Sequence, residues 1–375
     1  MTSEWNHFAL GEITELVIDY RGKTPRKLGG DWCKQGYRAL SAKNIKTGRI
    51  VQAETIRYID ESLYRKWMKD EVQRGDILIT SEAPFGQIFF WDSDEKIVLS
   101  QRLFCVRIKP EYDARFIYYY MTTPEFQSEL DGRATGTTVI GLRQPELMKC
   151  IIRCPEIQEQ KAIAAILSSI DAKIIANEKV NDNLQQQAQV IYSSMFIDNP
   201  DPAWSHGHLS DLITVKYGKD HKKLADGIYP VYGSGGIMRY VERPLYNKES
   251  VLIPRKGTLN NVMYVNQPFW SVDTMFYTEM KLPNVAKFVY HFVKAKDLAS
   301  MNAGSAVPSM TTDILNAMEV VIPSASALEE FESLVAPMYE AMEANDVQSK
   351  ALSQMRDTLL PKLMSGKIDV SSVQL

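Results

Sequence analysis

The sequence PEIQEQKAIAAILSSIDAKIIAN, residues 155–177, opens a long helical stretch, and a second stretch of the same kind follows 168 positions later. The second reads PSASALEEFESLVAPMYEAMEAN, residues 323–345. Few residues are identical beyond the outer Pro and Asn, yet each stretch follows a large region of short β-like runs. The chain is therefore predicted to build one structural unit twice.

The correspondence between the two halves continues upstream of the helices. The offset drifts slightly, as expected when loops of a duplicated sequence change length. Chance can produce one such pair of segments, but it explains an ordered series poorly. The further pairs are 133–155 with 301–323 (offset 168), RFIYYYM 115–121 with KFVYHFV 287–293 (offset 172), and DILIT 76–80 with SVLIP 250–254 (offset 174).

Both helical stretches carry apolar residues at alternating spacings of three and four, which is typical of a narrow coiled-coil seam. Polar exceptions coincide at Asn177 and Asn345, where paired amides can fix the register. We predict a two-helix coiled coil; the alternative is that each helix packs on its own globular region. Pro337 predicts a bend or a late start of the second helix. The predicted seam consists of Ile163, Leu167, Ile170, Ile174, Asn177, Leu184, Ile191, Phe331, Val335, Met338, Met342, Asn345, Leu352, Leu359 and Leu363.

The globular regions are predicted to be α+β, with short β-rich runs between Gly, Pro and Asn turns and one helix in each copy. The linker DNPDPAWSHG, 198–207, is rich in Pro and Asp and separates the halves. The predicted boundaries are an N-terminal arm (1–9), a first globular region (10–154), a long helix (155–197), the linker (198–207), a second globular region (208–322), a second long helix (323–366) and a tail (367–375).

The 375 residues are 45% hydrophobic, which is enough for ordinary cores in two or three domains. No run of about 18 apolar residues and no signal peptide is recognised. The four cysteines form no disulfide framework and are predicted to be reduced thiols, at Cys33, Cys105, Cys150 and Cys154. A cytoplasmic protein is predicted.

The net charge of −3 is unevenly distributed along the chain. Residues 11–154 carry a net charge of +3 and residues 199–322 carry +2, whereas 155–198 carry −3 and 323–366 carry −4. Two mildly basic regions thus alternate with two acidic helices. This pattern favours contact with nucleic acid by the former and with protein by the latter.

No catalytic or metal-binding signature emerges from the sequence. RGKT at 21–24 lacks the upstream Gly of a phosphate-binding loop, and YGSGGIM at 232–238 lacks the dinucleotide-binding spacing. NPDPAW at 199–204 departs from the motif of adenine methyltransferases. No catalytic residue, metal site or bound cofactor is therefore predicted for this chain.

Several loops combine Lys and Arg with Gly, Ser, Thr or Asn, the residue types that contact DNA phosphates through charge, hydroxyl and backbone N–H groups. The alternative is that these charges are only solvated surface groups. The predicted phosphate-contacting residues are Arg21, Lys23, Arg26, Lys27, Arg133, Thr135, Gly136, Thr137, Thr138, Arg143, Lys219, Lys222, Lys223, Arg255, Lys256, Asn302 and Ser305.

Other polar residues stand between predicted strands, at equivalent places in the two copies. Amide, guanidinium and carboxylate groups are suited to base edges in the major groove. The predicted base-reading residues are Gln87, Gln101, Arg102, Asn260, Asn261 and Asp273.

With these features the chain resembles the specificity subunit of type I restriction–modification enzymes over essentially its whole length. The resemblance rests on the two regions that each end in a helix, and on the closing segment LLPKLMSGKI, 359–368. In that family the first helix carries a Pro, a Glu-Gln pair and a later Asp, which Pro155, Glu159, Gln160 and Asp171 match. The second copy departs from this motif, with Glu329 and Glu330 in place of Glu-Gln and Tyr339 at the position of the Asp.

The resemblance implies two target recognition domains, each of which binds half of a split DNA site, held apart by an antiparallel pair of helices. It also implies that two adenine methyltransferase subunits dock on the helices and that restriction subunits join them. S-adenosylmethionine, Mg²⁺ and ATP would then serve those partners. Two other interpretations remain open: a DNA-binding scaffold of another defence system, and a stand-alone enzyme with an unrecognised site.

Overall fold

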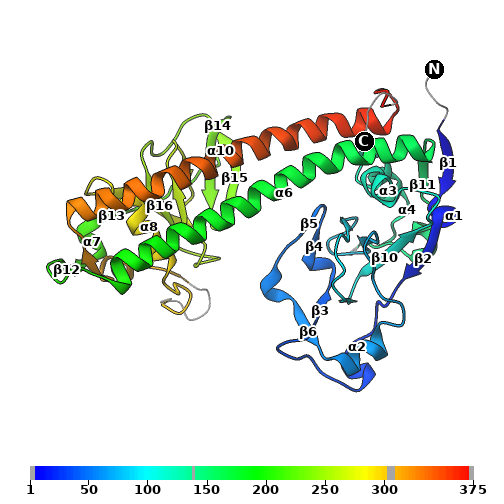
Figure 1. The fold of residues 1–375 in the computed structure, drawn as a ribbon, viewed down its shortest axis with the longest axis horizontal. Helices are drawn as coiled ribbons and strands as arrows, with labels where there is room; N and C mark the ends of the chain where they lie inside the picture. Colours follow the sequence, from blue (N-terminus) through cyan, green and yellow to red (C-terminus); the bar gives the residue numbers. More distant parts are fainter. Residues whose placement is uncertain (1–4, 137–139, 302–308, 371–375) are drawn as a thin grey trace. The chain divides into compact units, whose positions relative to one another are not determined.

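A computed structural model describes residues 5–136, 140–301 and 309–370, which form two compact units (Figure 1). Unit 1 comprises Met1–Ala176 and Gln348–Leu375, and unit 2 comprises Asn177–Val347. Each unit therefore contains one globular region and part of each long helix. The long helices are α6 (Ile157–Ser193) and α10 (Ala325–Met364).

The globular part of unit 1 begins and ends with strands that pair with each other. Side chains cap its helices: Asp60 accepts a hydrogen bond from Leu63 N, and Asp113 accepts one from Phe116 N. In chain order it contains β1 (Asn6–Ala9), α1 (Leu10–Ile13), β2 (Thr14–Ile18), η1 (Arg26–Leu28), β3 (Tyr37–Leu40), η2 (Ala42–Asn44), β4 (Ile45–Lys46), β5 (Arg49–Ile50), η3 (Ala53–Thr55), β6 (Arg57–Ile59), α2 (Glu61–Trp67), β7 (Ile77–Thr80), β8 (Ile88–Phe90), β9 (Ile97–Leu99), β10 (Leu103–Ile108), α3 (Ala114–Met121), α4 (Pro124–Arg133), α5 (Gln144–Leu147) and β11 (Ile151–Cys154).

The globular part of unit 2 follows a π-helical turn, η4 (Ser194–Asp198), at the end of α6. In chain order it contains β12 (Ser205–His208), α7 (Leu209–Leu212), β13 (Ile213–Tyr217), β14 (Asp226–Gly233), β15 (Gly236–Val241), β16 (Ser250–Pro254), β17 (Met263–Val265), β18 (Trp270–Ser271), β19 (Met275–Met280), α8 (Ala286–Lys294), α9 (Thr312–Asn316) and β20 (Glu319–Ile322).

The two units share one sheet topology. The larger sheet has the order β2-β10-β7-β8 in unit 1 and β13-β19-β16-β17 in unit 2. A smaller sheet has the order β6-β3-β9 in unit 1 and β15-β14-β18 in unit 2, with β3–β9 and β14–β18 parallel. In both units the first strand pairs with the last, β1 with β11 and β12 with β20. The predicted α+β tandem repeat is confirmed.

The repeat extends to contacts between side chains. Arg115 on α3 lies 4.2 Å from the centre of the Phe90 ring, and Lys287 on α8 lies 5.2 Å from the centre of the Tyr264 ring. Residues 115 and 287 are aligned at the offset of 172 predicted above. Each globular helix thus places a cation on an aromatic ring of the neighbouring strand at the same position.

A polar pair between the globular helix and the long helix also occurs in both units, with different chemistry. In unit 1 the Tyr119 hydroxyl donates to Asp171 Oδ2 at 2.6 Å. In unit 2 the aligned residues are His291 and Tyr339, whose Nε2 and hydroxyl oxygen are 2.9 Å apart. Both residues of the pair differ between the two units, yet a hydrogen bond joins them in each. A buried polar group without a partner would be costly.

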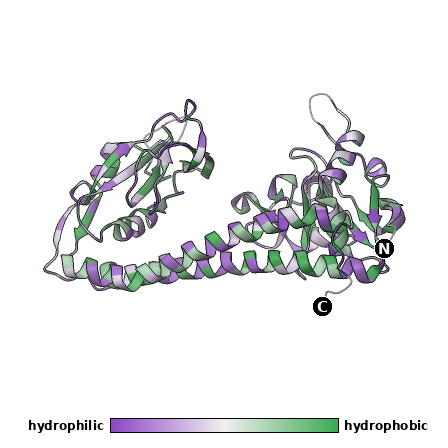
Figure 2. Cartoon of the chain, turned by 90° about the horizontal axis from the view of Figure 1, so that it is seen from above, coloured by the Kyte–Doolittle hydropathy of each residue, from purple (hydrophilic) through white to green (hydrophobic). Residues whose placement is uncertain are grey.

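The two long helices pair in antiparallel fashion within each unit. In unit 1 Arg356 Nη1 donates to Asp171 Oδ1 at 2.8 Å. In unit 2 the rings of Tyr192 and Phe331 are 6.2 Å apart. Residue numbers on α10 thus fall as those on α6 rise. Each predicted seam residue is buried or half-buried, and Figure 2 shows hydrophobic residues recurring along both helices.

Amide groups interrupt the apolar seam at the positions where the sequence shows polar residues. Asn177, which is 2% exposed, donates to the backbone oxygen of Asn345 at 3.4 Å. The Asn345 amide donates to Asn181 Oδ1 at 2.8 Å, and Asn181 donates to the backbone oxygen of Met342 at 3.2 Å. These bonds form only in one alignment of the helices, so they select the register.

The second long helix differs from one expectation. It begins at Ala325 and continues past Pro337, so a late start is wrong. A proline there removes one backbone hydrogen bond. The buried side chains of Phe331, Val335 and Tyr339 on the same stretch keep it in the core of unit 2.

The unit 2 polar pair makes the stability of the fold depend on pH. His291 is fully buried, its Nδ1 lies 2.8 Å from Gln189 Oε1, and burial lowers its pKa to about 4. The folded chain therefore holds a neutral imidazole at a pH where the unfolded chain, with a pKa near 6.5, takes up a proton. We expect the free energy of unfolding to fall as pH is lowered from about 6.5 to about 4, by at most about 3 kcal/mol.

Urea unfolding of the wild type and of His291→Gln across this pH range measures the effect. The variant should show a shallower decline, whereas the control His206→Gln, at an exposed position, should follow the wild type. Equal slopes in His291→Gln and the wild type would contradict the assignment.

Candidate nucleic-acid interface

Four loops that carry predicted DNA-contacting residues meet in unit 1. Ser81, just after β7, donates its backbone N–H to the oxygen of Arg102, between β9 and β10, at 2.9 Å. Ser81 O accepts in turn from the backbone N–H of Leu142 at 3.0 Å. Arg21 Nη1 donates to Leu142 O at 3.3 Å. The fold therefore joins four sequence segments, around residues 21, 81, 102 and 142, into one surface.

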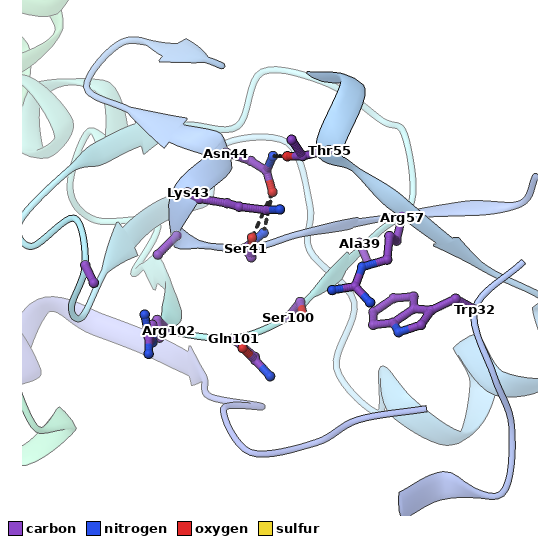
Figure 3. Close-up of a pocket in the computed structure, with 12 residues that line it drawn as sticks. Trp32, Ala39, Ser41, Lys43, Asn44, Thr55, Arg57, Ser100, Gln101 and Arg102 are labelled. Carbon is purple, nitrogen blue, oxygen red and sulfur yellow. Dashed lines mark hydrogen bonds between the residues drawn. The ribbon is translucent and has the colours of Figure 1, made fainter. Parts of the chain in front are cut away.

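A cavity of about 220 Å³ opens on one side of this surface (Figure 3). Gln101 and Arg102 reach it from the β9–β10 loop, and the Arg57 guanidinium lies 4.6 Å from the centre of the Trp32 ring. Ala42 N donates to Gln101 O at 3.1 Å and so holds the loop against η2. The full lining is Trp32, Ala39, Ser41, Ala42, Lys43, Asn44, Thr55, Arg57, Ala83, Ser100, Gln101 and Arg102.

One buried amide, that of Asn44, connects segments that line this first cavity. Asn44 is fully buried, accepts from the Ser41 hydroxyl at 2.9 Å, and donates to Thr55 Oγ1 at 3.1 Å (Figure 3). Sequence reasoning missed the cations Lys43 and Arg57 and the ring of Trp32. They lie on separate short elements with no clustering in the sequence, and only the fold brings them together.

A second cavity, of about 230 Å³, lies on the neighbouring loops. The side chain of Arg143 is exposed and has no hydrogen-bonding or ionic partner among the described residues. The Ser81 hydroxyl is buried and also lacks a partner within the described part of the chain. The second cavity thus has the positive charge of Arg143 at its surface and the Ser81 hydroxyl in its wall. The full lining is Arg21, Ser81, Glu82, Thr135, Gly141, Leu142 and Arg143.

Several of the predicted phosphate-contacting cations of unit 1 already have intramolecular partners. Arg21 pairs with Asp19 at 2.8 Å and lies 4.0 Å from the centre of the Phe104 ring. Lys23 donates to Trp67 O at 2.6 Å, and desolvation lowers its pKa. Lys27 donates to Gly22 O, and Arg133 pairs with Glu129, each at 2.8 Å. These side chains hold their loops in place, and their contact with DNA stays a prediction.

Five of the six predicted base-reading residues fall into two groups. Gln101 and Arg102 line the first cavity. Gln87 instead accepts from Thr47 N at 3.0 Å, Asn260 donates to Asp297 at 3.0 Å, and Asn261 donates to Ser234 O at 2.8 Å. The three amides of the second group thus brace loops, because amide groups satisfy backbone and side-chain partners that a turn leaves unpaired.

Unit 2 repeats the joining of loops with other side chains. Arg255 N donates to Thr274 O at 2.9 Å, and Met310 N donates to Arg255 O at 2.9 Å. This backbone pattern matches that of Ser81, Arg102 and Leu142 in unit 1, so Lys256 stands where Glu82 does. Asp273 contributes its backbone oxygen to Arg255 Nη1 at 3.3 Å.

The Lys-rich loop of unit 2 lies close to the β18–β19 turn. Lys219 N donates to Ser271 O at 2.8 Å, and a Cβ on Gly218 would lie 2.0 Å from Val272 O, so only glycine fits there. Lys222 and Lys223 follow in the same loop. Four predicted phosphate-contacting residues lie outside the described residues: Thr137, Thr138, Asn302 and Ser305. Thr135 and Gly136 are described and directly precede the first of these two gaps.

Three further observations concern the described residues as a whole. No group of three or more His, Cys, Asp and Glu side chains there is placed to hold a metal ion. Among the helices within residues 5–136, 140–301 and 309–370, none has the length and hydrophobicity of a membrane span. All four cysteines are free thiols. Burial raises the pKa of Cys150 and of Cys154 to about 12, which makes both thiols unreactive near neutral pH.

The side chains of Arg26 and Arg143 are exposed in unit 1 and have no hydrogen-bonding or ionic partner among the described residues. We expect the double substitution of both by Ala to weaken binding to all DNA sequences and to flatten the salt dependence by roughly two slope units, because each phosphate contact releases about one counterion. The measurement is a titration of duplex DNA over a range of salt concentrations. Arg65→Ala on α2 removes an exposed arginine outside both cavities and should leave the slope unchanged.

Comparison with known proteins shows which protein family has this architecture. The model of the type I restriction modification DNA specificity domain matches residues 2–186 and 203–331. The HindI specificity subunit of Haemophilus influenzae is 32% identical over 80% of this chain and 88% of its own length. The MjaIX specificity subunit of Methanocaldococcus jannaschii is 24% identical over 80% of this chain and 79% of its own length.

A solved structure agrees with the fold. The S subunit of a type I restriction–modification system from M. genitalium matches with a TM-score of 0.59 at 19% identity, over 96% of each chain. Two matches of one domain family, in tandem, each cover one globular region and extend into the long helix that follows it. The chain belongs to the type I restriction–modification DNA specificity family, and its role is that of a specificity subunit that recognises DNA sequence.

Proposed function

We propose that the two units recognise two unlike blocks of a bipartite DNA target. The observation that carries the proposal is the pair of equivalent loop surfaces with different side chains. Ser81, Glu82 and Arg102 in unit 1 correspond to Arg255, Lys256 and Thr274 in unit 2 through the same backbone hydrogen bonds. A shared fold with different functional groups is suited to reading two different short sequences in the same manner.

We further propose that α6 and α10 set the distance between the two blocks. A helix rises about 1.5 Å per residue, so the 37 residues of α6 extend over roughly 55 Å. The asparagine contacts and the Arg356–Asp171 pair fix one antiparallel register. Because the register is fixed, the spacer between the blocks would be fixed too.

The same helices are proposed to dock two adenine methyltransferase subunits, through which restriction subunits can join. Both helices are acidic and carry apolar side chains that face solvent, and exposed apolar groups of this kind mark protein contact sites. Methyl transfer with S-adenosylmethionine and cleavage with Mg²⁺ and ATP would belong to these partners, in the cytoplasm. The exposed apolar residues are Ile175, Val180, Val190, Leu334, Val347 and Met355.

Co-expression with the methyltransferase subunit of its system should give a complex of one specificity chain and two methyltransferase chains, measured by native mass spectrometry. Val190→Asp and Val347→Asp, at side chains 67% and 65% exposed, should weaken assembly because each would bring an uncompensated charge into an apolar contact. The control is Ile228→Asp, at an apolar side chain that is 78% exposed on β14 and lies outside both helices. If the specificity chain is found without bound methyltransferase chains, the proposed partner is excluded.

The spacer is tested by lengthening both helices together. Seven residues, one heptad, inserted after Glu178 in α6 and matched by seven before Glu343 in α10 preserve the seam and add about 10 Å. We expect the spacer of the methylated sites to grow by about three base pairs, at 3.4 Å each, while both blocks keep their sequences. Sequencing of methylated adenines in cells that express the complex measures this.

The control inserts seven residues in α6 alone, which breaks the match between the helices and should abolish methylation. A continuous target in the wild type, or an unchanged spacer in the double insertion, would contradict the proposal.

A further inference from the structure

Glu82 and Arg102 form an ion pair between the two cavities of unit 1. Arg102 Nε lies 3.1 Å from Glu82 Oε1, and their side chains are 47% and 36% exposed. Arg102 lines the first cavity and Glu82 lines the second. A guanidinium and a carboxylate thus stand side by side at the centre of the joined loops, both accessible from solvent.

The backbone that presents this pair is held in an unusual conformation. Arg102 has φ +65° and Ala83, next to Glu82, has φ +42°, values that residues with a side chain seldom adopt. The bond from Ser81 N to Arg102 O and the bridge between Glu82 and Gly141 fix both loops. Such conformations persist where the surroundings impose them, and they concentrate at sites that contact ligands.

The ion pair itself contributes little to the stability of the fold. Exposed pairs of this kind gain little from their mutual attraction, because water screens both charges. The strained backbone therefore places two side chains that the core does not need.

The major-groove edge of a G·C base pair complements this pair of groups. Guanine presents two acceptors, O6 and N7, to which an arginine donates through both arms of its fork, and cytosine presents an N4 amino donor that a glutamate accepts. We propose that Glu82 and Arg102 together recognise one G·C base pair in the half-site bound by unit 1. The inference rests on the proposed function and names the contact that unit 1 makes.

The surroundings of the pair fit a duplex. The exposed Arg143 at the second cavity is suited to a phosphate, and Lys43 and Arg57 in the first cavity add positive charge on the other side. Unit 2 has Lys256 and Thr274 at the equivalent places and lacks the carboxylate there. Unit 2 would accordingly recognise a different base pair, as two unlike blocks require.

The test uses the complex with the methyltransferase subunits. Arg102→Lys keeps the charge and loses the two-armed donor, and Glu82→Gln keeps the shape and loses the charge. We expect each variant to relax preference at one G·C position of one block by about 10- to 100-fold, with the other block and the spacer unchanged. Sequencing of methylated adenines reports the preference at each position.

A binding measurement separates a direct contact from an effect on folding. A duplex with 7-deazaguanine at the identified position lacks the N7 acceptor, and it should bind the wild type about 10-fold more weakly than the normal duplex. Arg102→Lys should discriminate less between the two duplexes. Thermal unfolding should show both variants folded, since the pair is half-exposed.

The matched control is the Arg65–Glu61 pair on α2, also an exposed ion pair of unit 1 and outside both cavities. Arg65→Lys and Glu61→Gln should leave the methylated sequence unaltered. If folded variants at Glu82 and Arg102 methylate the same sequence as the wild type, this inference is overturned. The proposal of a bipartite target would then still stand. A wild-type complex with a continuous target would overturn the proposed function instead.

Discussion

The antiparallel seam between α6 and α10 is the constraint on which the rest of the molecule depends. Each long helix contributes to the cores of both units: Leu167 and Leu363 are buried in unit 1, and Tyr192 and Phe331 are buried in unit 2. A shift of one helix along the other would remove these side chains from both cores at once. The amides of Asn177, Asn181 and Asn345 oppose such a shift, because their hydrogen bonds match in one register only.

The two copies have diverged in pairs of residues that touch. Tyr119 with Asp171 in unit 1 has become His291 with Tyr339 in unit 2, and both pairs join the globular helix to a long helix. The departure of the second copy from the family motif at Tyr339 thus has a physical reason. An aspartate there would bring a further carboxylate beside the buried His291 and beside Lys287, which already pairs with Glu332 at 2.5 Å. A tyrosine hydroxyl instead satisfies His291 without a further charge.

The loop surfaces show how one framework supports two specificities. The same backbone hydrogen bonds join the loops in both units, although the side chains at residues 81, 82 and 102 differ from those at 255, 256 and 274. The backbone framework is thus compatible with more than one set of side chains. Other polar residues nearby, such as Asn44 and Asn261, are committed to holding the loops and cannot vary in the same way.

Periodicity and internal alignment were sufficient to predict the tandem α+β repeat, both long helices and the polar exceptions in the seam, because these features depend on residues close in sequence or at a constant offset. The same signals pointed to the loops around residues 21, 81, 101 and 133 as candidate DNA-contacting segments. They did not separate Gln87 and Asn260, which brace loops, from Gln101 and Arg102, which line a cavity. Nor did they find Trp32, Lys43 and Arg57, or the pairing of Glu82 with Arg102. Which polar group is already satisfied depends on contacts between distant segments, and only the packed structure supplies those contacts.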